Sequence, residues 1–84
     1  MLSARQIRAA RSLLNWNGSD LTNACGIALT TLRRYESVEG IPSGNISNLV
    51  KIKHALENAG IEFTGDPLKN PGVTLHLAKG NNNE

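Results

Sequence analysis

The sequence is poor in the residues that catalysis, metal binding and covalent cross-linking require. Its one cysteine, Cys25, excludes an intramolecular disulfide and any multi-cysteine zinc site. The two histidines, His54 and His76, share no motif, and Asp20 and Asp66 fall in different predicted loops without a paired acid. No H-E-x-x-H, P-loop or G-x-S-x-G motif occurs. We therefore predict no catalytic residues, no metal site and no cofactor.

Aromatic residues and long apolar runs are also scarce. One Trp, one Tyr and one Phe within a 39% hydrophobic composition indicate a core of Ala, Leu and Ile, which is typical of a small helical domain. A chain of 84 residues is the size of one domain. No apolar run approaches the length of a membrane span, and the first residues do not resemble a signal peptide. We expect a cytoplasmic protein with no membrane partner.

The distribution of charge is more informative than the net charge of +2. Before Tyr35 the only acidic residue is Asp20, whereas the basic residues there are Arg5, Arg8, Arg11, Arg33 and Arg34. A basic first half predicts a polyanionic partner. The alternative is an arginine-rich helix face that is simply solvated.

Two short helical patterns meet at Gly26 in the middle of the chain. Spacings of three and four residues give each pattern one inward face, composed of Leu21, Ala24 and Cys25 and then of Leu32, Tyr35 and Glu36. Glycine ends a helix in the left-handed conformation without steric cost. A helix, a glycine-containing turn and a second helix form the unit that places its second helix in a DNA major groove.

This stretch resembles the Cro/CI-like (XRE) helix-turn-helix repressors, whose pattern is L-A-x-x-x-G-[VI]-S-x-x-T-[IL]-x-x-x-E. The matching positions are Leu21, Gly26, Ile27, Thr31, Leu32 and Glu36. The resemblance covers about residues 3–60, and the segment that follows fits a short phage or mobile-element variant. It implies a mainly α fold: a four-to-five-helix Cro/CI repressor-like DNA-binding domain with a short C-terminal β-hairpin or pair of strands.

The resemblance also implies roles for the second helix of the motif, expected at about Leu29–Ser37. Leu29, Thr30 and Arg34 occupy base-reading positions, and Thr31 and Arg33 lie nearer the phosphates. The chemistry agrees, because arginine can bind guanine O6 and N7 and an apolar group can meet a thymine methyl. For Leu29 the alternative is an incidental surface leucine.

Two positions depart from the family pattern. Gly18 stands where the family usually has a glutamine that contacts a phosphate, so Asn17 or Ser19 is expected to take over that contact. Asn17 and Ser19 are also the candidate caps of the helix that follows. Ala28 stands where a serine or threonine normally caps the second helix, and the missing cap should cost about 1 kcal/mol.

The flanking helices are predicted from caps and apolar spacing. Ser3 and Gln6 can form a capping box before a face of Ile7, Ala10, Arg11 and Leu14. Arg11 on this inward face is expected to form an ion pair with Glu36, as the resemblance also implies; the alternative is that it snorkels to solvent. After a loop, a later helix carries Ile46, Leu49, Ile52, Leu56 and Ala59 on one face.

The start of that later helix offers a further phosphate site. Ser43 and Asn45 lie there, with Asn45 as the preferred cap. Capping alone is an alternative explanation for both residues.

Beyond Gly60 the pattern changes from helical to alternating. Residues 61–64 and 73–77 are predicted strands whose apolar side consists of Ile61, Phe63, Val73, Leu75 and Leu77. We predict a DNA-binding domain at 1–60, strands at 61–79 that form a dimer interface, and a disordered tail at 80–84. The alternative is that the hairpin only folds back on the last helix of its own chain.

Together these features predict a sequence-specific transcriptional regulator that binds double-stranded DNA. We expect a homodimeric repressor of phage or mobile-element genes that binds a pseudo-palindromic operator through the major groove. The alternative is an antitoxin or other module with a protein partner, which uses the same fold for autoregulation.

Overall fold

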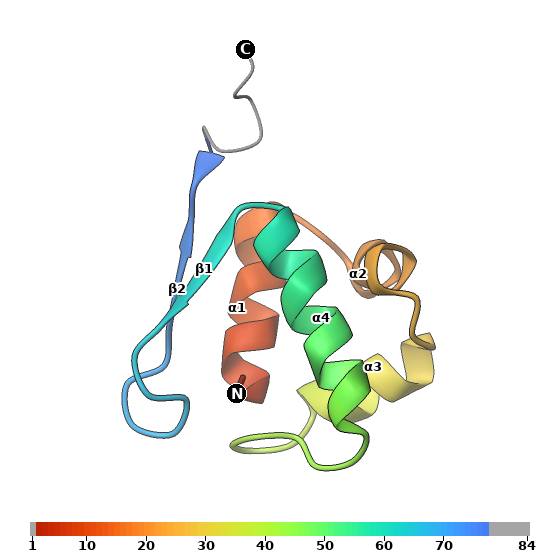
Figure 1. The fold of residues 1–84 in the computed structure, drawn as a ribbon. Coiled ribbons are helices and arrows are strands. Elements are labelled where there is room, and N and C mark those ends of the chain that lie inside the picture. Colours follow the sequence, from red (N-terminus) through yellow and green to blue (C-terminus); the bar gives the residue numbers. More distant parts are fainter. Residues whose placement is uncertain (1, 78–84) are drawn as a thin grey trace.

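The computed structural model describes residues 2–77, and the tail predicted at 80–84 lies outside these residues. The elements are α1 (Ala4–Leu14), α2 (Gly18–Cys25), α3 (Leu29–Glu36), α4 (Ile46–Asn58), β1 (Ile61–Thr64) and β2 (Gly72–Leu75). In Figure 1, α1 and α4 lie at the centre, α2 and α3 lie on one side of them, and the hairpin of β1 and β2 lies on the other. The described part of the chain is thus mainly helical with one C-terminal hairpin, as predicted.

Capping boxes begin both of the first two helices. The N–H of Gln6 donates to Ser3 Oγ at 3.2 Å, and the N–H of Ser3 donates to Gln6 Oε1 at 3.0 Å. The N–H of Asp20 donates to Asn17 Oδ1 at 2.8 Å, and the N–H of Asn17 donates to Asp20 Oδ2 at 2.9 Å. Asn17, and not Ser19, is therefore the cap of α2. Each box satisfies two backbone donors that a helix start leaves unpaired.

The turn between α2 and α3 follows from its glycine. Gly26 ends α2 at φ +80°, in the left-handed region. Helix α3 then begins after Ala28, and within the described residues no side chain caps it. Asn45 does cap α4, because its Oδ1 accepts from the N–H of Ser47 at 2.9 Å.

The core lies where the four helices and the hairpin meet. Its buried members are Leu2, Ile7, Ala10, Leu21, Leu32, Tyr35, Leu49, Ile52, Leu56 and Ile61. Two predicted core residues are wrong: Ala24 is exposed, and Ile46 is 62% exposed. Ile46 is the first residue of α4, and the contact of this helix with the core starts one turn later at Leu49.

The hairpin packs its apolar side on the chain's own helices. Strand β1 pairs antiparallel with β2, with Ile61 opposite Leu75 and Phe63 opposite Val73. Ile61 is 3% exposed, and the three partly buried side chains that pack on the core beside it are Phe63, Val73 and Leu75. The predicted second strand was too long, because β2 ends at Leu75 and Leu77 is 77% exposed.

Helix α1, and not only the last helix, holds the hairpin. Gln6 donates from Nε2 to the carbonyl oxygens of Thr64 at 3.3 Å and Gly72 at 3.2 Å. Its Oε1 simultaneously accepts from Ser3. Gln6 is 3% exposed, so these hydrogen bonds satisfy a buried amide that would otherwise be costly.

Candidate nucleic-acid interface

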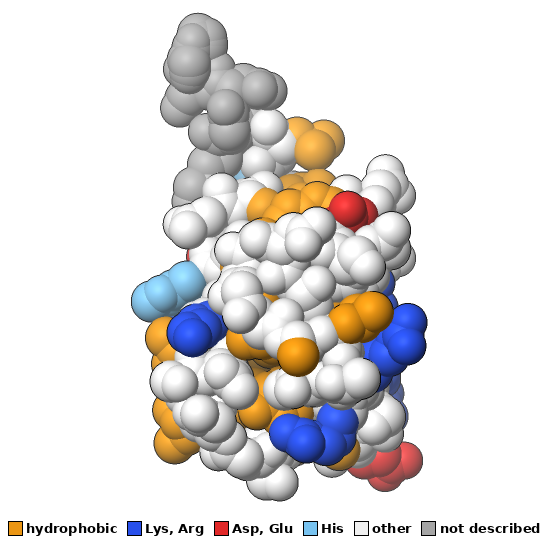
Figure 2. Space-filling view, turned by 90° about the vertical axis from the view of Figure 1, so that its right-hand side faces the viewer, with side chains coloured by type: hydrophobic (Ala, Val, Ile, Leu, Met, Phe, Trp, Pro, Cys, Tyr) orange, Lys and Arg blue, Asp and Glu red, His pale blue; other side chains and the backbone are white. Residues whose placement is uncertain are grey.

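Helices α2 and α3 form a compact pair with one side turned inward. Leu21 from α2 and Leu32 and Tyr35 from α3 are buried, and Ile27 in the turn is half-buried. The opposite side of α3 is exposed at Thr30, Arg33 and Arg34. Figure 2 shows the face of the molecule formed by these two helices, with Lys and Arg side chains at both sides and along the lower part and few acidic ones.

A salt bridge ties the end of α3 to α1. Arg11 Nε lies 2.7 Å from Glu36 Oε2, and Arg11 Nη2 lies 2.9 Å from Glu36 Oε1, so the contact is bidentate. Arg11 also donates from Nη1 to the carbonyl oxygen of Trp16 at 2.9 Å. The two side chains are 22% and 12% exposed, so Arg11 does not snorkel into solvent. The hydrogen bond to Glu36 raises the pKa of Arg11 against the opposing effect of burial, which keeps the guanidinium charged.

A second arginine of α1 strengthens the same contact. Arg8 donates from Nη1 to the main-chain carbonyl oxygen of Glu36, at the C-terminal end of α3. Cations favour this end of a helix because its last carbonyl groups are unpaired and carry partial negative charge. The role of Arg8 was not predicted from the sequence. The sequence feature that could have indicated this role is the spacing of Arg8 and Arg11, which lie three residues apart and therefore on the same side of α1.

A hollow of about 460 Å³ lies between the start of α2 and the outer side of α3. It brings together four of the predicted contact residues, Asn17, Ser19, Leu29 and Arg33. Gly18 also lines it, so the first turn of α2 borders the hollow with backbone and short polar side chains. Arg11 and Glu36 also line the hollow, but their charges are paired with each other. The positive end of the α2 dipole and the guanidinium of Arg33 therefore make its electrostatics suited to an anion.

Leu29 lines this hollow and also packs against the hydrophobic core. It was predicted to lie outside the core, yet its side chain is half-buried and packs against core residues. Gly18 also lines the hollow, and a Cβ added to it would lie 2.9 Å from Leu29 Cδ1.

The remaining predicted positions lie outside the hollow. Thr30 and Arg34 are exposed and Thr31 is half-buried. The guanidinium of Arg34 lies 5.4 Å from the centre of the Tyr35 ring, a cation–π distance. The Tyr35 hydroxyl accepts from Asn48 Nδ2 at 3.5 Å.

Ser43 and Asn45 are both exposed in the segment before α4. Asn45 Oδ1 accepts from the N–H of Ser47 at 2.9 Å and from its Oγ at 2.8 Å. The capping role therefore already occupies this oxygen. The amide NH₂ of Asn45 and the hydroxyl of Ser43 are the donors that these residues would offer to a phosphate.

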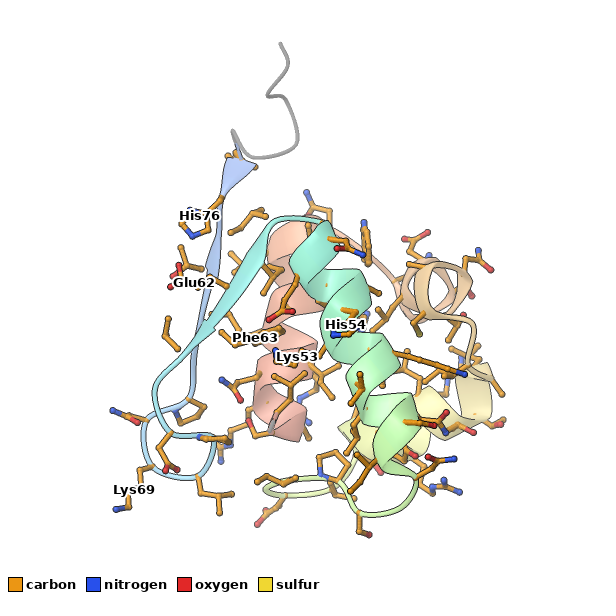
Figure 3. The ribbon with its side chains drawn as sticks, in the orientation of Figure 1. Lys53, His54, Glu62, Phe63, Lys69 and His76 are labelled. Atoms are coloured by element: carbon orange, nitrogen blue, oxygen red, sulfur yellow. The ribbon has the colours of Figure 1, made fainter. Side chains whose placement is uncertain are left out.

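Some of the charged side chains elsewhere in the molecule form ion pairs. In Figure 3, His76 lies beside Glu62 on the hairpin and Lys69 lies at the hairpin loop, across the α1–α4 pair from α2 and α3. His76 Nε2 is 2.7 Å from Glu62 Oε1, and Lys53 pairs with Glu57 at 2.8 Å. Within residues 2–77, Arg33 and Arg34 have no ion-pair partner, and the same is true of Arg5, Arg8, Lys51 and Lys69 on other parts of the chain. This part of the structure therefore leaves two positive charges on α3 uncompensated.

Two classes of site are absent from the described part of the chain. No three residues among its His, Cys, Asp and Glu lie close enough to hold a metal ion. Nor is any described helix long and apolar enough to cross a membrane.

Comparison with known proteins gives an informative similarity. No protein-family profile matches the chain. It is 40% identical over 55 residues to the cryptic phage CTXphi transcriptional repressor RstR of Vibrio cholerae serotype O1. The alignment covers 66% of this chain and 47% of that repressor, so the chain spans about half the length of the relative. The similarity is thus to a transcriptional repressor of phage type.

Proposed function

We propose that this protein is a transcriptional repressor of phage or mobile-element genes that binds double-stranded DNA by sequence. In this proposal α2 and α3 are a helix-turn-helix of the Cro/CI-like (XRE) type, and α3 enters the major groove. The observation that carries it is the outer side of α3, where Arg33 and Arg34 are exposed without ion-pair partners among residues 2–77. The similarity to a phage transcriptional repressor supports the same function.

The proposed contacts divide into two groups. Arg34 and Thr30, on the exposed side of α3, read base edges, and Leu29 was predicted to join them. Phosphate contacts are assigned to the remaining polar positions: Asn17, Ser19, Thr31, Arg33, Ser43 and Asn45. Asn17, Ser19 and Arg33 share the hollow between α2 and α3, so one phosphate placed there can meet all three.

We further propose that the protein acts as a homodimer paired through the edge of β2. The N–H of His76 donates to Gly60 O at 2.8 Å, and hydrogen-bonded pairs alternate along an antiparallel ladder. The main-chain groups of Val73 and Leu75 therefore point away from β1, toward the open edge of β2. The apolar side chains predicted for the dimer pack mostly inside the chain, which leaves this edge as the pairing element. A two-fold partner would set two α3 helices about 34–36 Å apart, one turn of DNA.

Selection of bound duplexes from a random pool, followed by sequencing, tests the DNA-binding proposal. We expect enrichment of a pseudo-palindromic sequence with half-sites about one helical turn apart. If no sequence is enriched while a cellular protein is captured stoichiometrically, the DNA-binding proposal is wrong and the protein-binding alternative replaces it.

Sedimentation of wild type and Val73→Pro tests the dimer. Proline removes an N–H that the β1–β2 ladder does not use, so the hairpin should survive while edge pairing is lost. We expect a wild-type dimer and a folded, monomeric variant with an unchanged circular dichroism spectrum. A monomeric wild type at high protein concentration, or a variant that remains dimeric, would rule out pairing through this edge.

A further inference from the structure

The side chain of Leu29 lies where a side chain at position 18 would need to be. Gly18 is the first residue of α2, and Leu29 is the first residue of α3. A Cβ added to Gly18 would lie 2.9 Å from Leu29 Cδ1 and 3.8 Å from Leu32 Cδ2. The first of these distances is shorter than a carbon–carbon contact allows. Leu29 therefore fills the volume that a side chain at position 18 would take.

The start of α3 depends on this contact more than an ordinary helix start would. No side chain in the described part of the chain caps α3 at Ala28, whereas α1, α2 and α4 each have a side-chain cap. An uncapped first turn frays unless packing holds it. The half-buried Leu29 supplies that packing, at the point where the turn leads into the exposed side of α3.

We propose that Leu29 is a positioning residue of the DNA-binding surface rather than a base contact. Its side chain fills the space above Gly18 and holds the first turn of α3 against the first turn of α2. The contact thereby sets the position of Thr30 and Arg33 relative to Asn17 and Ser19. This inference rests on the proposed function and reassigns one of its residues.

The four proteins of a double-mutant cycle test the shared space without DNA: wild type, Gly18→Ala, Leu29→Ala and the double variant. In Gly18→Ala the new methyl group displaces the flexible end of Leu29, so the amide NMR signals of Thr30 and Arg33 should shift. In the Leu29→Ala background the same substitution should leave them nearly unmoved. The backbone effect of replacing glycine is common to both backgrounds and cancels. Equal shifts in both backgrounds would overturn the proposal.

Binding to the duplex selected by the wild type then tests the functional part. We expect Gly18→Ala to weaken binding about 5- to 10-fold when Leu29 is present and less than about 2-fold in the Leu29→Ala background. Leu29→Ala should weaken binding without altering the preference at any base pair, and Leu29→Met, of similar volume, should restore it to within about 2-fold.

Two results distinguish the failure of this proposal from failure of the proposed function. Loss of preference at one base pair in Leu29→Ala would make Leu29 a base contact and refute the positioning role. If the wild type binds no duplex, the proposed function fails, while the amide shifts still decide whether Gly18 and Leu29 share one space.

Discussion

Breaking the Arg11–Glu36 salt bridge should destabilise the fold. The expected loss of stability lies between the loss on removing an exposed ion pair and the loss on breaking a buried one. Exposed pairs contribute about 0–1 kcal/mol, and removing one partner of a fully buried pair costs about 3–5 kcal/mol. The Arg11 and Glu36 side chains are 22% and 12% exposed and meet through two hydrogen bonds. We therefore expect Glu36→Ala to lower the free energy of unfolding by about 2–4 kcal/mol.

The companion variant, Arg11→Met, loses more than the ion pair. It also removes the hydrogen bond from Nη1 to the carbonyl oxygen of Trp16. That loss adds about 1 kcal/mol, so Arg11→Met should be the more damaging of the two variants. Arg8 still donates to the main-chain carbonyl of residue 36 in both variants, because this contact does not use the Glu36 side chain.

Urea denaturation of wild type, both single variants and the double variant measures the coupling. We expect the double variant to lose at least about 1 kcal/mol less than the sum of the singles. The Lys53–Glu57 pair in α4 is a matched control, since its side chains are 40% and 37% exposed at a distance of 2.8 Å. Its coupling should be only about 0.3–0.5 kcal/mol. Additive effects at Arg11 and Glu36 would refute the conclusion that the pair holds α3 in place.

Four further changes test separate parts of the molecule. Arg34→Ala should weaken binding to the selected duplex by about 1–3 kcal/mol and relax preference at one base pair, and equal loss on random DNA would make Arg34 a phosphate contact. Arg33→Ala should weaken binding to all sequences and reduce the dependence of affinity on salt, as measured by titrations at several salt concentrations. Ala28→Ser should stabilise the fold by about 0.5–2 kcal/mol by capping α3, and an unchanged melting temperature would contradict this. Gln6→Leu should destabilise by about 1–3 kcal/mol, because the carbonyl groups of Thr64 and Gly72 each lose a hydrogen bond and the N–H of Ser3 loses its acceptor. Amide exchange at Thr64 should then be faster than in wild type.

Local patterns in the sequence determined the secondary structure closely. Spacings of three and four residues predicted the helices, alternation predicted β1 at residues 61–64, and the caps Ser3 and Asn45 are confirmed. These features depend on residues within one or two turns of each other. For that reason they can be read without knowing how the chain folds back on itself. The errors at Ala24 and Ile46 show the limit, because an apolar residue at the correct spacing is buried only if a neighbouring element reaches it.

Contacts between distant segments were decided by the tertiary structure. The sequence identified Gln6 as a capping residue, but only the packing of the hairpin on α1 brings its amide to Thr64 and Gly72. The packing of the Leu29 side chain beside Gly18 could not be predicted from the local sequence either. A glycine at a helix start does not indicate whether a side chain from another helix lies next to it. Which volume a side chain fills depends on the approach of two helices, and that approach is set by the whole core rather than by either segment.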